Sequence, residues 1–124
     1  MFSLPLVMIG GALGAGARYL VGRWLLVLMG PGYPWGTLAV NLLGGLAMGV
    51  LIGVLARISA GESVRLFLAV GLLGGFTTFS AFSLDIVAMI ERGAAVAAIG
   101  YALMSVIGAV VALFAGMAAV RGLA

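Results

Sequence analysis

The chain has 124 residues, of which 65% are hydrophobic and only 7% are charged, with a mean hydropathy of +1.38. A water-soluble domain of this size needs more charge to cover its surface, so the composition indicates an integral membrane protein. The net charge of +3 comes from six Arg and three acidic residues, which is ordinary for membrane spans and does not indicate nucleic-acid binding. The sequence contains no Cys and no His. An enzyme is therefore the least expected class, because no nucleophile–base pair or catalytic metal cluster can be assembled.

Four segments are long and apolar enough to cross a bilayer as helices, since one crossing needs about 20 residues. They cover residues 4–29, 36–56, 66–90 and 94–120, and short turns connect them. A single four-helix transmembrane domain, residues 1–124, is therefore expected to be the whole architecture. The first segment lacks a charged n-region and a cleavage site, so it is expected to be a retained span and not a signal peptide.

The first two spans each carry a polar residue on a glycine-rich face. Arg18 shares a helix face with glycines, and it is expected either to face protein or water or to extend to the membrane interface. Asn41 continues a ridge of glycines that allows another helix to approach closely. Asn41 is predicted either to hold helices together or to line a path for an anion with its amide hydrogens. The ridge consists of Gly45, Gly49 and Gly53.

The third span is predicted to be broken near its middle, in residues 74–83, GGFTTFSAFS. The glycine pair disfavours a continuous helix, and Thr77 or Thr78 can cap a new one. At such a break, freed carbonyl groups favour a cation and freed amides favour an anion. Phe79 and Phe82 share a helix face, and their ring edges beside hydroxyl donors suit a small hard anion. Core packing is the alternative interpretation of this Phe pair.

The fourth span carries Tyr101 and Ser105 on one face, although a Ser in a helix often bonds back to its own backbone. Small residues on every span predict close helix packing and hence a homo-oligomer. Arginines divide almost evenly between the two sides of the membrane, so the positive-inside bias is weak. Either something outside the sequence sets the orientation, or the chain inserts in both orientations. This would permit an antiparallel homodimer. One side has Arg57, Arg65 and Arg121, and the other has Arg23 and Arg92.

Three stretches resemble the Fluc (CrcB) family of fluoride channels. They are GGALGAGARY at residues 10–19, GTLAVNLLGG at residues 36–45 and GLLGGFTTFSAFS at residues 71–83, the last being the most specific. The resemblance covers essentially the full chain. It implies a fluoride-selective passive ion channel in a bacterial or archaeal plasma membrane. It also implies a dual-topology, antiparallel homodimer with two pores, whose partners are the fluoride ion, a second copy and the lipid bilayer.

The resemblance further implies a structural Na+ at the centre of the dimer, held by the backbone carbonyls of Gly74 and Thr77 from each subunit. Arg18 matches a family arginine that would act as vestibule charge or as a structural residue. Because fluoride is strongly hydrated, its pathway must replace the lost water with many close donors. The pathway residues that the resemblance implies are Asn41, Phe79, Ser80, Phe82, Tyr101 and Ser105.

The sequence departs from the family pattern at three positions. Ala81 stands where relatives often have Thr, and Ala109 where a further hydroxyl can occur. Asp85 stands where Glu is usual, and its side chain is shorter.

Other functions are weighed against the channel. A small multidrug exporter relies on an acidic residue in its first span, and residues 1–29 contain none. An ion-coupled small-anion transporter is the alternative function, although Asp85, the only acid well inside a span, supplies a poor proton relay. A purely structural oligomer would explain the glycine ridges but not the cluster of Thr, Phe and Ser in the third span.

Overall fold

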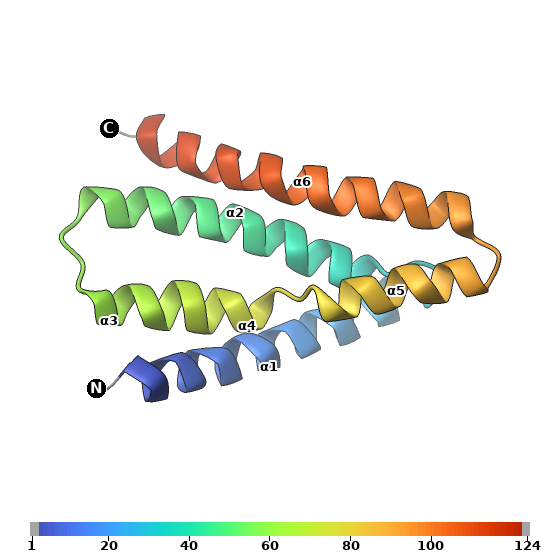
Figure 1. The fold of residues 1–124 in the computed structure, drawn as a ribbon, viewed down its shortest axis with the longest axis horizontal. Helices are drawn as coiled ribbons and strands as arrows, with labels where there is room; N and C mark the ends of the chain where they lie inside the picture. Colours follow the sequence, from blue (N-terminus) through green and yellow to red (C-terminus); the bar gives the residue numbers. More distant parts are fainter. Residues whose placement is uncertain (1–2, 123–124) are drawn as a thin grey trace.

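The computed structural model describes residues 3–122, and within this range it contains only helices, turns and loops. Four helices are long and apolar enough to cross a membrane, and the third is bent where its helical hydrogen bonding stops (Figure 1). The predicted all-α membrane fold with a broken third span is therefore confirmed. The elements are α1 (Ser3–Met29), α2 (Trp35–Arg57), α3 (Glu62–Arg65), η1 (Leu66–Leu73), α4 (Gly74–Phe76), α5 (Ser80–Glu91) and α6 (Ala95–Gly122).

The span bounds agree with the prediction to within one or two residues except at the start of the third span. That span begins at Glu62 and not at residue 66, because Glu62 and Arg65 form a first helical turn joined by a salt bridge. The next segment, η1, is wound as a π-helix, a form found mostly in short stretches and often near functional sites. No sequence pattern predicted this winding.

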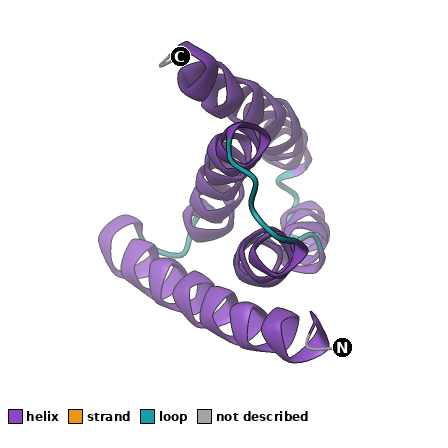
Figure 2. Cartoon of the chain, turned by 90° about the vertical axis from the view of Figure 1, so that its left-hand side faces the viewer, coloured by secondary structure: helices purple, strands orange, loops and turns teal. Residues whose placement is uncertain are grey.

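The spans form two packed pairs. α2 packs chiefly on α6, while α1 packs on η1 and α4. Seen from one end, α1 and α6 lie on opposite sides of the molecule, with α2 and the third span between them (Figure 2). Both termini and the α2–α3 loop lie at the same end, as four spans require.

Glycines allow both pairs to pack backbone against backbone. A Cβ atom at Gly10 would lie 2.6 Å from the Phe67 carbonyl oxygen in η1. A Cβ atom at Gly45 would lie 2.7 Å from the Ala109 carbonyl oxygen in α6. The glycine ridge of the second span therefore receives another helix, as predicted, but that helix belongs to the same chain. The ridge is consequently no evidence for an oligomer.

Candidate functional site

The third span leaves its helix at Thr77, whose φ of −84° and ψ of 158° are extended, and α5 begins at Ser80. Side chains replace the missing helical hydrogen bonds. The Thr78 amide donates to Asn41 Oδ1 at 3.1 Å, and Asn41 Nδ2 donates to the Thr78 carbonyl oxygen at 3.2 Å. The Ala81 amide donates to Thr78 Oγ1 at 3.2 Å. Thr78, one of the two predicted caps, therefore caps the second half of the span.

Thr77 makes a different local contact from Thr78. Its hydroxyl donates to the Leu73 carbonyl oxygen at 3.0 Å, one turn back. The Thr77 side chain therefore bonds to the first half of the span, and Thr78 alone of the two threonines caps α5.

The break frees the carbonyl groups of Gly74 and Thr77. In a continuous helix these would accept from the amides of Thr78 and Ala81, since each amide bonds to the carbonyl four residues before it. Both amides donate to side-chain oxygens instead. Free carbonyl oxygens at a broken span are suitable ligands for a small hard cation such as Na+. Within residues 3–122 there is no cluster of three or more His, Cys, Asp or Glu that could hold a metal ion.

Arg18 contacts the same break from α1. Its Nε donates to the Gly75 carbonyl oxygen at 3.2 Å, and the side chain is half-buried. The guanidinium thus faces the protein, and it occupies the Gly75 carbonyl, which directly follows that of Gly74. A buried Arg is tolerated in a span when it is paired in this way.

A groove of about 380 Å³ opens beside the break, between α2 and α6. It brings together four predicted pathway residues: Asn41, Phe79, Phe82 and Ser105. Ser105 is buried, and its Oγ has no hydrogen-bond partner among the described residues, so it is a polar group that still needs one. Asn41 uses one of its two amide hydrogens on Thr78 and retains the other.

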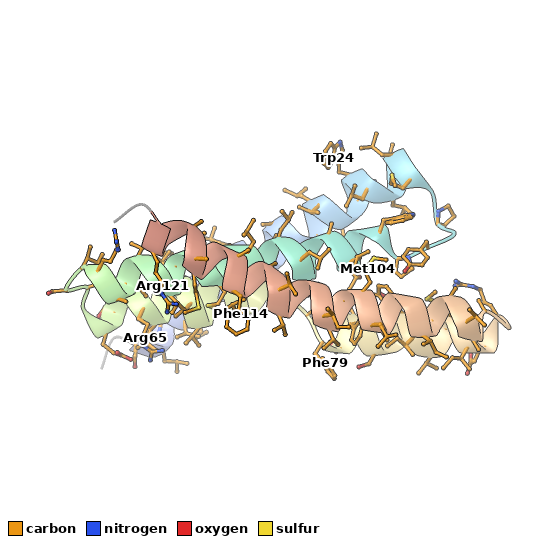
Figure 3. All side chains as sticks on the ribbon, turned by 90° about the horizontal axis from the view of Figure 1, so that it is seen from above. Trp24, Arg65, Phe79, Met104, Phe114 and Arg121 are labelled. Atoms are coloured by element: carbon orange, nitrogen blue, oxygen red, sulfur yellow. The ribbon has the colours of Figure 1, made fainter. Side chains whose placement is uncertain are left out.

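The two Phe rings at the groove differ in environment. Phe79 is 76% exposed and points away from the helices, whereas Phe82 is 7% exposed (Figure 3). Their ring centroids lie 5.6 Å apart with an interplanar angle of 51°, a favourable tilted arrangement. The exposed ring lies on a face of the chain that no other span covers.

Ser80 and Tyr101 do not line this groove. Ser80 is exposed, and its Oγ lies 3.4 Å from Thr78 Oγ1. Tyr101 is fully buried behind Phe82, and its hydroxyl donates to Asp85 Oδ2 at 2.9 Å. Sequence reasoning missed the Tyr101–Asp85 pair, for which the only signal was a hydroxyl and an acid inside neighbouring spans. Asp85, although shorter than Glu, does reach a partner.

The three positions that depart from the family pattern lie in different places. Ala109 lines the groove and contributes a methyl group there. Ala81 lines a separate cavity of about 270 Å³ on the side of Arg18. Asp85 lines a third cavity, also of about 270 Å³, together with Tyr33, Trp35 and Arg92.

Comparison with known proteins identifies the family. The family described as CrcB-like protein, Camphor Resistance (CrcB), matches residues 5–117. The chain belongs to this CrcB family. The resemblance predicted from the three sequence stretches is thus confirmed, and the CrcB chain with its four spans is a multi-pass membrane protein.

Curated CrcB relatives match over nearly their whole length. A protein of Mesorhizobium japonicum named fluoride-specific ion channel FluC is 56% identical over 99% of both chains. A protein of the same name from Sphingopyxis alaskensis is 56% identical over 99% of this chain and 98% of its own. A third, from Agrobacterium fabrum, is 50% identical over 99% of both. These relatives are named as ion channels and not as enzymes.

Proposed function

We propose that this chain is a fluoride-selective passive channel of the cell membrane, which exports fluoride down its electrochemical gradient. The observation that carries the proposal is the match, at 56% identity over essentially full length, to proteins named fluoride-specific ion channels. The helix break and the groove beside it provide hydrogen-bond donors and aromatic ring edges that suit an anion.

Several weak donors line the groove beside the break. These are the second amide hydrogen of Asn41, the unpartnered hydroxyl of Ser105 and the ring edges of Phe79 and Phe82. Ring edges carry partial positive charge. Many weak donors can replace the water around a fluoride ion and still release it, which conduction requires. Ser80 and Tyr101 would extend this pathway beyond the groove.

A structural Na+ fits the donor set at the break. The carbonyl groups of Gly74 and Thr77 would hold it, since their helical donors are bonded elsewhere. The bound ion would supply a fixed positive charge near the pathway. Elemental analysis after exchange into sodium-free buffer tests this proposal: retained sodium supports it, and complete loss with undiminished fluoride flux contradicts it.

An antiparallel homodimer would complete the pathway. Gly74 and Phe79 are exposed on the single chain, and the groove is open on that side. A second copy related by a two-fold axis would cover this face and bring a second set of freed carbonyls to the first. Two such grooves would give two pores per dimer.

The test is ion efflux from liposomes that contain the purified protein, with fluoride compared with chloride. We expect fast fluoride efflux without chloride efflux and without an imposed proton or sodium gradient. Phe79→Ile and Phe82→Ile should each slow fluoride efflux about tenfold or more, since about 1.4 kcal/mol of lost stabilisation in the rate-limiting state has that effect. Phe114→Ile is the matched control, because Phe114 is an exposed ring on α6 outside the groove.

Two outcomes would contradict the passive channel. Fluoride efflux that requires an imposed ion gradient would indicate the ion-coupled small-anion transporter. No anion efflux from well-folded protein would leave the Phe pair as packing residues.

A further inference from the structure

A row of aromatic rings connects the loop after the first span to the groove. It starts at Trp35 and Tyr33, whose centroids lie 4.6 Å apart, and continues to Tyr101 at 5.7 Å from Tyr33. Phe82 follows at 5.3 Å from Tyr101, and Phe79 at 5.6 Å from Phe82. Each separation falls in the range at which aromatic rings attract one another in defined orientations. The row therefore links two aromatic residues at the start of the second span, Tyr33 and Trp35, with the proposed pathway.

Tyr101 occupies the middle of this row and is held from both ends. Its hydroxyl donates to Asp85, and the ring of Tyr33 meets its ring at 86°, an edge-to-face contact. Phe82 packs on the ring of Tyr101 at an interplanar angle of 48°. Tyr101 is 0% exposed, and its ring is packed between the rings of Tyr33 and Phe82, so it cannot tilt without pressing on them. A change in its orientation must therefore move Phe82.

The turn between α1 and α2 places Tyr33 rigidly. Gly30, at a φ of +79°, ends α1 in a conformation that favours glycine. The Trp35 amide donates to the Tyr33 carbonyl oxygen at 2.8 Å, and Pro34 between them restricts the backbone. Tyr33 is half-buried against the core that contains Phe82 and Tyr101. A residue outside the spans thus packs against the ring of Tyr101.

We propose that Tyr33 is a positioning residue of the anion pathway: braced by Trp35, it holds Tyr101 against Phe82 and so sets which part of the Phe82 ring faces the groove. This inference rests on the proposed function. The orientation of Phe82 matters because only the edge of its ring attracts an anion, while the face repels it. Tyr33 itself does not touch the ion.

The experiment measures fluoride efflux from liposomes for full-length Tyr33→Leu, Tyr33→Phe, Tyr101→Phe and the double variant Tyr33→Leu/Tyr101→Phe. Losing an edge-to-face contact should slow efflux in Tyr33→Leu by about three- to tenfold. Tyr33→Phe keeps the ring and should conduct within about twofold of the parent chain. In the double variant the fold-reduction in fluoride efflux should be smaller than the product of the two single fold-reductions, since the effects of coupled residues are not additive.

The control is Trp24→Leu, because Trp24 is an exposed aromatic residue near the same end of the molecule and lies outside the row. It should conduct like the parent chain. Size-exclusion chromatography and thermal unfolding of each variant identify any that fail to fold. If Tyr33→Leu does not fold, Tyr33→Met replaces it.

The outcomes separate this inference from the channel proposal. If the parent chain conducts fluoride and Tyr33→Leu conducts equally well, the positioning role is wrong while the channel stands. The role is also wrong if Tyr33→Phe loses as much efflux as Tyr33→Leu, or if the losses in the double variant multiply fully. If the parent chain conducts no fluoride, the channel proposal fails and takes the positioning role with it.

Discussion

Single side chains maintain the break in the third span. Asn41 bonds both the amide and the carbonyl of Thr78, so it replaces two backbone partners that the interrupted helix has lost. Thr78 in turn accepts from the Ala81 amide, and Arg18 satisfies the Gly75 carbonyl. Each bond matters because unpaired backbone groups inside a bilayer cost several kcal/mol. The Asn thereby serves as interhelical support while one of its amide hydrogens stays free, so both roles considered for it are compatible.

Thr78→Val should destabilise the protein by about 1 kcal/mol, the usual cost of losing a helix cap. The hydroxyl that accepts from the Ala81 amide would be replaced by a methyl group of similar size. Thr77→Val is the matched control and should cost less than about 0.5 kcal/mol, because its hydroxyl only bonds back to a carbonyl one turn away. Reversible unfolding in detergent measures both. Equal losses in the two variants would show that Thr78 is not the cap.

Among the elements, α1 packs along η1 and α4, the two segments that lead up to the break. Gly10 and Gly14 bring α1 against the carbonyl groups of Phe67 and Leu72 in η1. Gly75 likewise lies against the backbone of Gly11. This close contact fixes the position of the first half of the third span, and hence of the carbonyls of its last turn.

Gly14→Ala should separate α1 from η1 and destabilise the protein by about 1–3 kcal/mol, the usual cost of overpacking. The added methyl group would overlap the Leu72 carbonyl oxygen and approach the Phe76 amide nitrogen to 2.7 Å, and backbone atoms cannot move aside as a flexible side chain can. Gly16→Ala, two residues further along the same helix, is the control. Its added methyl group meets nothing within 4 Å, so the change should be neutral or slightly stabilising. Thermal unfolding in detergent compares them; an unaffected Gly14→Ala would show that η1 can shift freely.

For the whole molecule, the arrangement of the spans leaves one side open at the groove. α2 lies between α6 and the third span, so its glycine ridge is covered within the chain, while Phe79 on the neighbouring face is not. A buried pathway would need this face covered. The proposed antiparallel partner would do so, and the nearly even distribution of arginines agrees with the two orientations that such a dimer needs.

Positive charge added at one end of the molecule should force a single orientation in the membrane and abolish fluoride export. Ser59→Lys with Gly61→Lys adds two charges to the α2–α3 loop, and Gly32→Lys with Glu91→Lys biases the opposite end. These positions are exposed, so the fold should tolerate the changes. In fluoride-sensitive bacteria, neither double variant alone should restore growth in fluoride, whereas their co-expression should. Full tolerance from either variant alone would contradict the antiparallel dimer.

Local patterns in the sequence determined much of this protein. Span length and hydropathy gave four helices, because hydrocarbon forces every crossing segment to satisfy its own backbone. The pair Gly74-Gly75 followed by two threonines located the break, since these residues disfavour helix and then restart it. The family resemblance rested on the same stretches.

Tertiary structure alone decided which groups meet. Asn41 and Thr78 are 37 residues apart, and the distance between Arg18 and Gly75 is 57 residues. Whether such groups bond depends on how the helices cross and which rotamers the packing allows, and no local pattern encodes either. The same holds for the Tyr101–Asp85 pair, for the π-helical winding of η1 against α1, and for the row of rings from Trp35 to Phe79. The sequence thus located the polar groups, and the packing of the spans decided which of them pair with one another.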